Sequence, residues 1–158
     1  MPLAAALAAA GCGGSSAPSP RALTGPGFDF DAPATWSVKQ TPQSVEAMQG
    51  DRAVSVTVFA LRRTYRPELW PEVVPELDGV ATRLADQLRG RAEAGTTVSV
   101  AGRRARRYDI AFSRDGKDFV ERITFVLDGK REYQLLCRYR AGDDEPACAA
   151  LGSSFRLR

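Results

Sequence analysis

The chain has 158 residues, of which 44% are hydrophobic and 26% charged, and its formal net charge is +3. This balance is ordinary for one globular domain. The sequence contains no histidine. That absence excludes acid–base catalysis by histidine, Ser-His-Asp and Cys-His nucleophile systems, and ordinary zinc enzymes.

A cysteine follows a short apolar run at the N-terminus. Residues 2–10 are apolar, but they are too few to span a bilayer, which needs about 20 residues. With the small residues before Cys12, the run resembles a bacterial lipoprotein signal peptide, whose cysteine is lipidated and becomes the mature N-terminus. The resemblance implies that residues 1–11 are the signal peptide, and that Cys12 anchors the protein in the cell membrane at its extracytoplasmic face. No basic residue precedes the run, so we expect the true start to lie upstream. The alternative is an alanine-rich leader with an incidental cysteine.

The next segment differs in composition from the rest of the chain. Residues 13–27 are rich in Gly, Ser, Pro and Ala and carry a single charge. We therefore assign 12–27 to the lipidated cysteine and a flexible tether. Residues 28–158 are numerous enough to bury nearly 70% of their unfolded surface and to fold as a single domain.

Three cysteines are present, an odd number for an exported protein. Lipidation of Cys12 leaves Cys137 and Cys148 as a pair, in a compartment where disulfides persist. A bridge between them would stabilise the fold by about 2–3 kcal/mol through the entropy of the unfolded chain. The alternative is two buried thiols.

Segments with the two-residue periodicity of strands and the 3.6-residue periodicity of helices follow one another along the chain. Residues 28–30 begin the ordered part, and a turn at 33–36 leads into a strand. Residues 53–61 are β-branched and aromatic, which predicts another strand. The period then changes to that of a helix over 75–93, with apolar residues at i, i+3, i+4, i+7 and i+11. The stripe consists of Leu77, Val80, Ala81, Leu84 and Leu88.

The ends of this helix carry their own signals. Pro75 suits a first helical turn, where a missing N–H costs no hydrogen bond. Glu76 and Asp78 favour the positive end of the helix dipole. Gly95 is the residue we expect to close the C-terminus.

Four further strand-like runs come after the helix. They are Thr97 to Val100, Arg104 to Phe112, Phe119 to Leu127, and Arg131 to Tyr139. Asp115-Gly116 and Asp128-Gly129 between them predict type I′ hairpins and hence an antiparallel meander. Residues 119–127 are apolar on both faces, so both faces of the sheet should be covered. A short helix over 145–152 and a last strand at 155–157 complete the chain, giving an α+β fold.

This order of elements resembles the Mog1/PsbP-like fold and the actinobacterial lipoproteins grouped with it. The likeness covers nearly all of 28–158 and is carried by Phe28-Asp29-Phe30 with Pro33 and Trp36, by Val100-Ala101-Gly102, by the strand at 131–139, and by Ser154-Phe155-Arg156. The resemblance implies an α/β/α sandwich, an antiparallel sheet between the long helix and the short one. It implies no single activity, because members bind a small GTPase, support photosystem assembly or have no assigned role.

Residues for catalysis or cofactor binding are not recognisable. No phosphate-binding or dinucleotide-binding glycine pattern occurs, and Cys137 and Cys148 lack metal-ligand spacing. Asp143-Asp144 precede a predicted helix, where turn chemistry and the helix dipole explain them. We therefore predict a protein that is not an enzyme, with no catalytic residues, no metal and no cofactor.

One basic cluster stands out, formed by Arg103, Arg104, Arg106 and Arg107. Side chains alternate along a strand, so Arg104 and Arg106 should point to one face and the other two to the opposite face. Contact with anionic lipid headgroups or cell-wall polymers is one interpretation. We favour the other, in which the arginine stems cover apolar surface and the charges stay solvated. A nucleic-acid partner is not predicted.

Two hypotheses about function follow. In the first, the chain is a lipid-anchored, exported, non-catalytic binding or assembly module of the cell envelope, with an unidentified protein partner. In the second, it carries a small apolar or lipid-like ligand between the long helix and the sheet. A closed helix–sheet interface would favour the first, and an apolar cavity of a few hundred Å³ the second.

Overall fold

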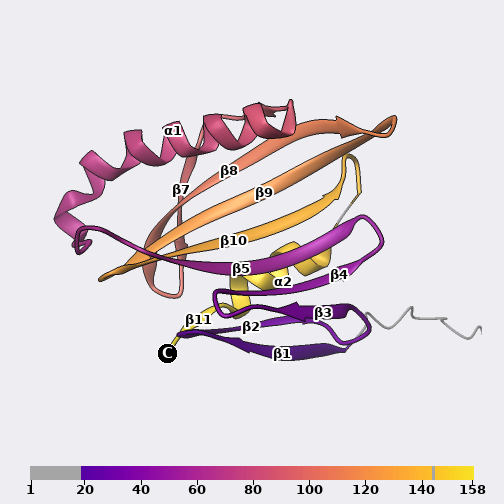
Figure 1. Cartoon of the computed structure of the whole chain (residues 1–158), viewed down its shortest axis with the longest axis horizontal. Coiled ribbons are helices and arrows are strands. Elements are labelled where there is room, and N and C mark those ends of the chain that lie inside the picture. Colours follow the sequence, from indigo (N-terminus) through magenta and orange to yellow (C-terminus); the bar gives the residue numbers. More distant parts are fainter. Residues whose placement is uncertain (1–18, 144) are drawn as a thin grey trace, which may run out of the picture.

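An eight-stranded antiparallel sheet runs through the molecule, and a three-stranded sheet lies beside it (Figure 1). The computed structural model describes residues 19–143 and 145–158, so Cys12 lies outside the described residues. Strand order in the large sheet is β3-β4-β5-β10-β9-β8-β6, with β7 also paired to β8. In the small sheet the order is β1-β2-β11.

The described part of the chain forms eleven strands, two α-helices and one 3₁₀ turn. In chain order these are β1 (Pro20–Gly25), β2 (Phe28–Pro33), β3 (Ser37–Gln40), β4 (Ser44–Gln49), β5 (Arg52–Ala60), η1 (Pro67–Leu69), α1 (Trp70–Leu88), β6 (Arg91–Ala92), β7 (Thr96–Val100), β8 (Arg103–Arg114), β9 (Lys117–Asp128), β10 (Arg131–Arg140), α2 (Pro146–Ser154) and β11 (Arg156–Leu157).

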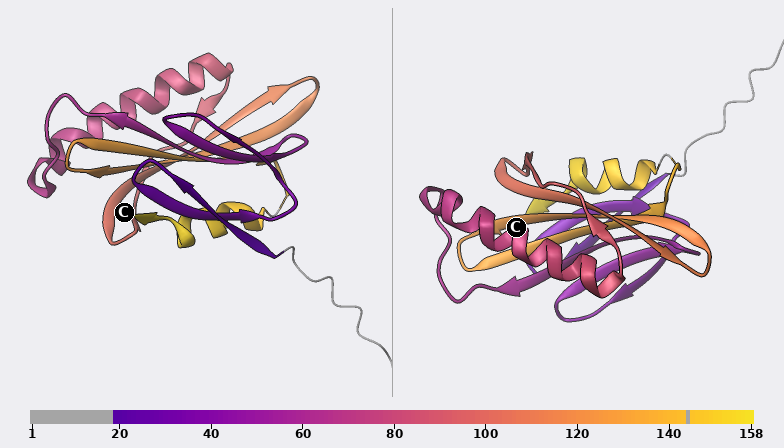
Figure 2. Two further views of the ribbon diagram at one scale, coloured as in Figure 1. Left: turned by 60° about the horizontal axis from the view of Figure 1, so that its bottom comes forward. Right: turned by 90° about the horizontal axis from the view of Figure 1, so that it is seen from above.

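The two helices lie on opposite faces of the large sheet (Figure 2). The long helix α1 packs against β8 and β6, whereas α2 packs against β10, β5 and the small sheet. An antiparallel sheet with one long and one short C-terminal helix is the α+β fold predicted from the sequence. Both faces of β9 are covered, as its apolar residues on both sides required.

The N-terminal boundary of the domain was predicted wrongly. Residues 20–25, assigned to the tether, form β1, which pairs with β2 along its whole length. Leu23 is buried opposite Phe30 and supplies the apolar contact that holds this strand. The Gly-Pro-Gly sequence at 25–27 forms the turn of this hairpin, with Gly27 at φ 83°. It is not part of a linker.

The start of α1 was also misplaced, at Pro75 instead of Trp70. Pro71 occupies the first turn, where no hydrogen bond is lost. Pro75 lies inside the helix, and its missing N–H leaves the Pro71 carbonyl without its i+4 partner. Either proline would suit the first turn of a helix. The helix begins at the earlier one, where Trp70 is buried.

At its other end α1 stops at Leu88, well before the predicted Gly95. Arg89 takes the left-handed conformation at φ 52°, and its N–H bonds back to the carbonyls of Ala85 and Asp86. Gly95 has a different role, because a Cβ there would lie 2.4 Å from the ring of Tyr108. Close approach to the sheet explains that glycine.

The predicted meander is confirmed as β7-β8-β9-β10. Asp115 and Gly116 have φ of 54° and 70°, as a type I′ turn requires. The next turn differs from the prediction. Asp128 pairs with Arg131, so Gly129 and Lys130 form the turn, and of these two only Gly129 has positive φ. Glycine first is the type II′ pattern.

Two apolar cores result, one on each face of the large sheet. The larger one fills the space between this sheet, the small sheet and α2. Its centre is formed by the rings of Phe28, Tyr133 and Phe155, whose centroids lie 5.7–6.2 Å apart. The smaller core lies under α1, where Leu77 and Ala81 of the predicted stripe are buried against the sheet.

The described residues contain no helix that is both long enough and apolar enough to cross a membrane.

Candidate functional site: a groove along α1

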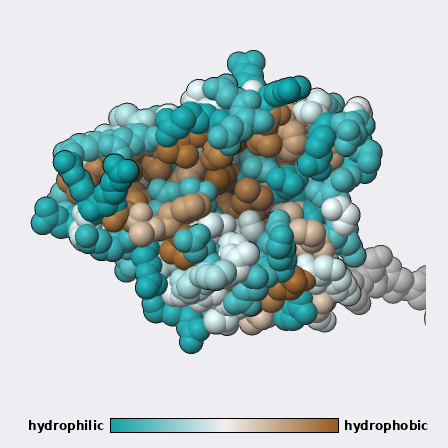
Figure 3. Space-filling model, viewed as in Figure 1, coloured by the Kyte–Doolittle hydropathy of each residue, from teal (hydrophilic) through white to brown (hydrophobic). Residues whose placement is uncertain are grey.

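A groove lies between the first half of α1 and the neighbouring end of the large sheet, with a cavity volume of about 490 Å³. Val73, Leu77 and Val80 of α1 form one wall, and Leu127 at the end of β9 contributes to the floor. Figure 3 shows hydrophobic residues gathered in the middle of this face, below the helix. The interface between helix and sheet is therefore not closed.

The opposite wall is the segment 61–65, which connects β5 to η1. Two backbone hydrogen bonds hold it. The N–H of Leu61 donates to the carbonyl of Lys130 at 2.9 Å, and that of Tyr65 donates to the carbonyl of Gly129 at 2.7 Å. Because both acceptors belong to the β9–β10 turn, this wall is fixed to the sheet.

The carboxylate of Glu132, on β10, lies on the sheet side of the groove. Gln134 Nε2 donates to Glu132 Oε1 at 2.7 Å. Burial raises the pKa of Glu132, and this hydrogen bond opposes the rise. Its neighbours across the strands are Leu127 and Phe59, and the Phe59 side chain is 42% exposed. The floor thus combines apolar surface with a carboxyl group whose neutral form the surroundings favour.

Charged side chains complete the lining. Arg62 and Arg63 belong to the connecting segment, and Glu72 and Glu76 to α1. Within the described residues none of the four takes part in a salt bridge. The groove therefore combines an apolar interior with solvated charges of both signs.

Helix α1, and with it the groove wall, is fixed to the sheet through Asp78. The Tyr108 hydroxyl donates to Asp78 Oδ1 at 2.5 Å, and Arg106 donates to the same oxygen from Nη2 at 3.1 Å. Burial and the bond to Asp78 raise the pKa of Tyr108 to about 12, against an opposing effect of Arg106. This polar cluster ties β8 to the middle of α1.

The arginine cluster divides between the faces as alternation predicted. On the α1 face, Arg106 is paired with Asp78, and Arg104 lies over the ring of Trp70 at 5.7 Å from its centroid. On the other face, Arg103 Nε donates to Asp128 Oδ1 at 2.8 Å. These three are engaged within the fold.

Arg107 differs from the other three. Its Nε donates to Thr124 Oγ1 at 3.4 Å, and no salt bridge to it occurs among the residues described. The four arginines thus form no common patch, and contact with headgroups or polymers stays a prediction.

The predicted disulfide is confirmed. Cys137 on β10 is bonded to Cys148 on α2, with a Cα–Cα distance of 5.5 Å. The bond joins the short helix to the sheet on the face away from the groove. The prediction of lipidation at Cys12 falls on a residue outside the described ranges.

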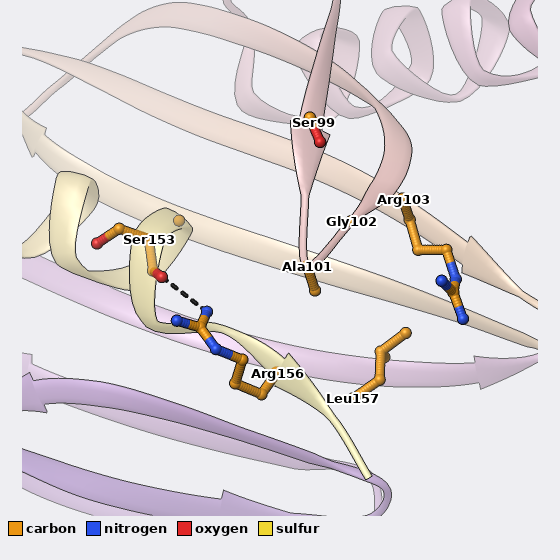
Figure 4. A pocket seen from close by; sticks show the side chains of 8 residues that line it. Ser99, Ala101, Gly102, Arg103, Ser153, Arg156 and Leu157 are labelled. Carbon is orange, nitrogen blue, oxygen red and sulfur yellow. Dashed lines mark hydrogen bonds between the residues drawn. The ribbon is translucent and has the colours of Figure 1, made fainter.

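A second opening, of about 600 Å³, separates the β7–β8 turn from the end of α2 and β11 (Figure 4). Arg156 folds back over α2, where its Nη1 donates to the Ser153 carbonyl at 2.7 Å. Figure 4 shows Arg103 directed away from Arg156. The side chains around this opening do not converge on a common point.

No group of three metal-ligating side chains occurs in the described ranges, and the two cysteines described are consumed by the disulfide. Sequence reasoning placed a ligand between helix and sheet but missed the 61–65 wall and Glu132. The only local signal was Pro67, which follows the end of a predicted strand. A proline there predicts a connecting segment but does not predict the position of that segment in the fold.

No protein-family model matches the sequence, and no curated protein matches it. Among solved structures, a protein of Bacteroides thetaiotaomicron matches with 10% identity and a TM-score of 0.58, over 83% of this chain and 45% of that one. This chain therefore spans less than half the length of that protein. LpqN of Mycobacterium tuberculosis, described as involved in cell envelope biogenesis, matches with 14% identity and a TM-score of 0.55. That match covers 88% of this chain and 90% of LpqN. At these identities the likeness shows a shared fold, and the Mog1/PsbP resemblance stays a prediction.

Proposed function

We propose that the protein is a non-catalytic binding module of the cell envelope, lipid-anchored through Cys12 at the extracytoplasmic face of the membrane. Its ligand is a small apolar or lipid-like molecule, which binds in the groove along α1. The groove is the observation that carries the proposal, because a closed helix–sheet interface would have favoured a protein partner instead.

The dimensions and lining of the groove support a small ligand. A volume of about 490 Å³ falls within the usual range for ligand pockets, roughly 300–1,000 Å³. Val73, Leu77 and Val80 supply apolar surface on the helix side, and charged side chains of both signs complete the lining. The backbone bonds at Leu61 and Tyr65 and the Asp78 cluster hold both walls before any ligand arrives, which lowers the entropic cost of binding.

Three observations support the envelope location. The apolar run and small residues before Cys12 resemble a lipoprotein signal. The Cys137–Cys148 disulfide suits an oxidising compartment. LpqN, which shares the fold, is described as involved in cell envelope biogenesis.

Two adjacent valines of α1 offer a matched test of the groove. Val73 lines it, whereas Val74 is not part of the lining. With the neutral apolar probe N-phenylnaphthylamine, Val73→Arg should weaken binding at least about tenfold, a change of about 1.4 kcal/mol. Val74→Arg should stay within about twofold of wild type. Fluorescence titration gives the affinities, and circular dichroism confirms folding of both variants.

Two results would contradict the groove assignment: no saturable probe binding by wild type, or equal loss in the two variants. If the probe does not bind but a neighbouring envelope protein cross-links at residue 73, the partner is a protein and the carrier proposal is wrong.

The anchor needs a separate experiment. Cys12→Ala should release the protein from the membrane fraction or leave it unprocessed. Fractionation and gel migration identical to wild type would contradict lipidation without bearing on the groove.

A further inference from the structure

A second candidate site lies on the opposite face of the large sheet, where β8 and β9 approach α2. Arg107, Arg122 and Thr124 line a narrow crevice there, together with Gly152 of α2. The crevice has a volume of about 20 Å³. A Cβ placed on Gly152 would lie 3.9 Å from Arg107 Nη2, and Gly152 lines both the crevice and the larger opening beside it.

Arg107 forms no salt bridge with a carboxylate of the described residues. Its bond to Thr124 Oγ1 is long, 3.4 Å, and involves a neutral group. Arg122 is nearby, but it is engaged with Asp109 through two hydrogen bonds of 2.8 and 2.7 Å. Burial and the positive charge of Arg122 both lower the pKa of Arg107, and Asp109 opposes them. A half-buried cation beside a like charge is unfavourable unless an anion compensates it.

Comparison with the other arginines shows that Arg107 is exceptional. Five arginines in the described ranges are half-buried, and four of them form salt bridges. The four pairs are Arg52–Glu145, Arg106–Asp78, Arg122–Asp109 and Arg138–Glu121. Arg107 is as buried as these, yet it faces a crevice instead of a carboxylate. An anion that paired with Arg107 would therefore lie in this crevice.

We propose that this crevice is an anion subsite, in which Arg107 and Thr124 bind the carboxylate or phosphate group of a small polar ligand. A guanidinium presents paired N–H donors that match such oxyanions. The crevice has room for about one water-sized group, so one oxygen of the anion enters it. The rest of the ligand lies in the opening of Figure 4, which shares Gly152 with the crevice and is lined by the hydroxyl-bearing residues Ser99 and Ser153. This site is independent of the groove along α1.

Inorganic phosphate and acetate are the probes, added to the purified protein at constant ionic strength. We expect saturable shifts of the Thr124 and Gly152 amide resonances in NMR spectra. Arg107→Gln should weaken binding at least about tenfold. Gly152→Leu should weaken it as well, because the added side chain takes up space in the crevice while the charge remains. Arg114→Gln, which removes an exposed arginine of the β8–β9 turn, is the control and should bind like wild type.

A second readout separates binding from a structural role. Without probe, Arg107→Gln should melt at the same temperature as wild type or higher, because an uncompensated charge has been removed. A lower melting temperature would mean that Arg107 has a structural role, and it would overturn the proposal. Absence of saturable binding by wild type, or unchanged binding by Arg107→Gln or Gly152→Leu, would also overturn it. So would Arg107-dependent binding to phosphatidylglycerol vesicles with none to phosphate or acetate, which would place the anion on a membrane surface.

Discussion

The two faces of the large sheet are covered to different extents. On the α2 face, the small sheet, the short helix and the disulfide enclose a core whose aromatic centre is 0–2% exposed at Phe28, Tyr133 and Phe155. On the α1 face, one helix packs against β8 and β6, shares a core with Ile123 and Phe125 of β9, and leaves a groove beside it. The larger buried apolar core thus lies on the α2 face, and the groove along the long helix lies on the other.

The dimensions of the elements explain this difference. A helix with its side chains is about 10 Å wide, and neighbouring strands lie about 4.8 Å apart, so one helix covers about two strands. Ala81 and Ala85 let α1 sit close to β8. Among the residues that the structure describes, no second helix lies over the rest of that face, above β10, β5 and β4 (Figure 1). A groove along α1 is the geometric result.

The largest effect should come from the enclosed core. Phe155→Ala should lower the free energy of unfolding by about 3–5 kcal/mol, because the surrounding rings cannot collapse into the cavity. Leu77→Ala, under α1, should cost less, about 2 kcal/mol, since that site borders the groove and can relax. Urea denaturation measures both. A larger loss for Leu77→Ala would reverse the ranking of the two faces.

Removing the disulfide should have the next largest effect. Cys148→Ser should lower the stability by about 2–3 kcal/mol, because the unfolded chain regains the entropy of an open loop. The fold should persist, and probe affinity in the groove should stay unchanged, since the bond lies on the other face. Reducing agent on wild type is the matching control. Loss of groove binding in the variant would show that the two faces are coupled.

The cluster that ties α1 to β8 should produce a pH dependence. The pKa of Tyr108 is raised to about 12 from 10.0, so folding favours its neutral form. That contribution is fully present below pH 10 and is lost as the pH rises towards 12. Wild type should therefore lose stability over this interval more steeply than Tyr108→Phe, in urea denaturation at stepped pH. Parallel curves would contradict the raised pKa.

Glu132 should give the smallest effect. Burial raises its pKa, so the neutral carboxyl favours folding at low pH, and this contribution is lost as the pH rises through the folded pKa. Glu132→Gln should thus melt slightly higher than wild type at pH 7, and the difference should disappear in acid. It should also bind the neutral probe more tightly. Glu46→Gln, at a half-buried position of β4, controls for the loss of one charge.

How far the sequence predicted the fold depends on how local each signal is. The Asp115-Gly116 turn and the alternation in its strands need no distant contact, and both were identified correctly. The start of α1 and the strand at 20–25 depend on packing partners elsewhere, Trp70 with the sheet and Leu23 with β2, and both were missed. Local composition does not predict the secondary structure of a segment when that structure depends on a tertiary contact.

The sites were predictable to different degrees for the same reason. The Cys137–Cys148 bond followed from counting cysteines in a chain that the sequence predicts to be exported. The groove depends on the position of the segment 61–65 in the folded protein. The proposed subsite depends on Arg107, the half-buried arginine that forms no salt bridge among the described residues. Alternation placed Arg107 on its face, but the absence of a partner is a property of the assembled fold.

The pairing of β11 with β2 bears on when this domain can fold. Leu157, almost the last residue, lies opposite Phe28 near the beginning of the domain, and the N–H of Arg158 donates to the Gly27 carbonyl at 3.0 Å. Contacts so distant in sequence form late, because closing a long loop costs entropy before any bond is gained. The small sheet therefore cannot be completed until the C-terminus is available. If the chain is exported, the free edge of β2 would stay unpaired until β11 has crossed the membrane.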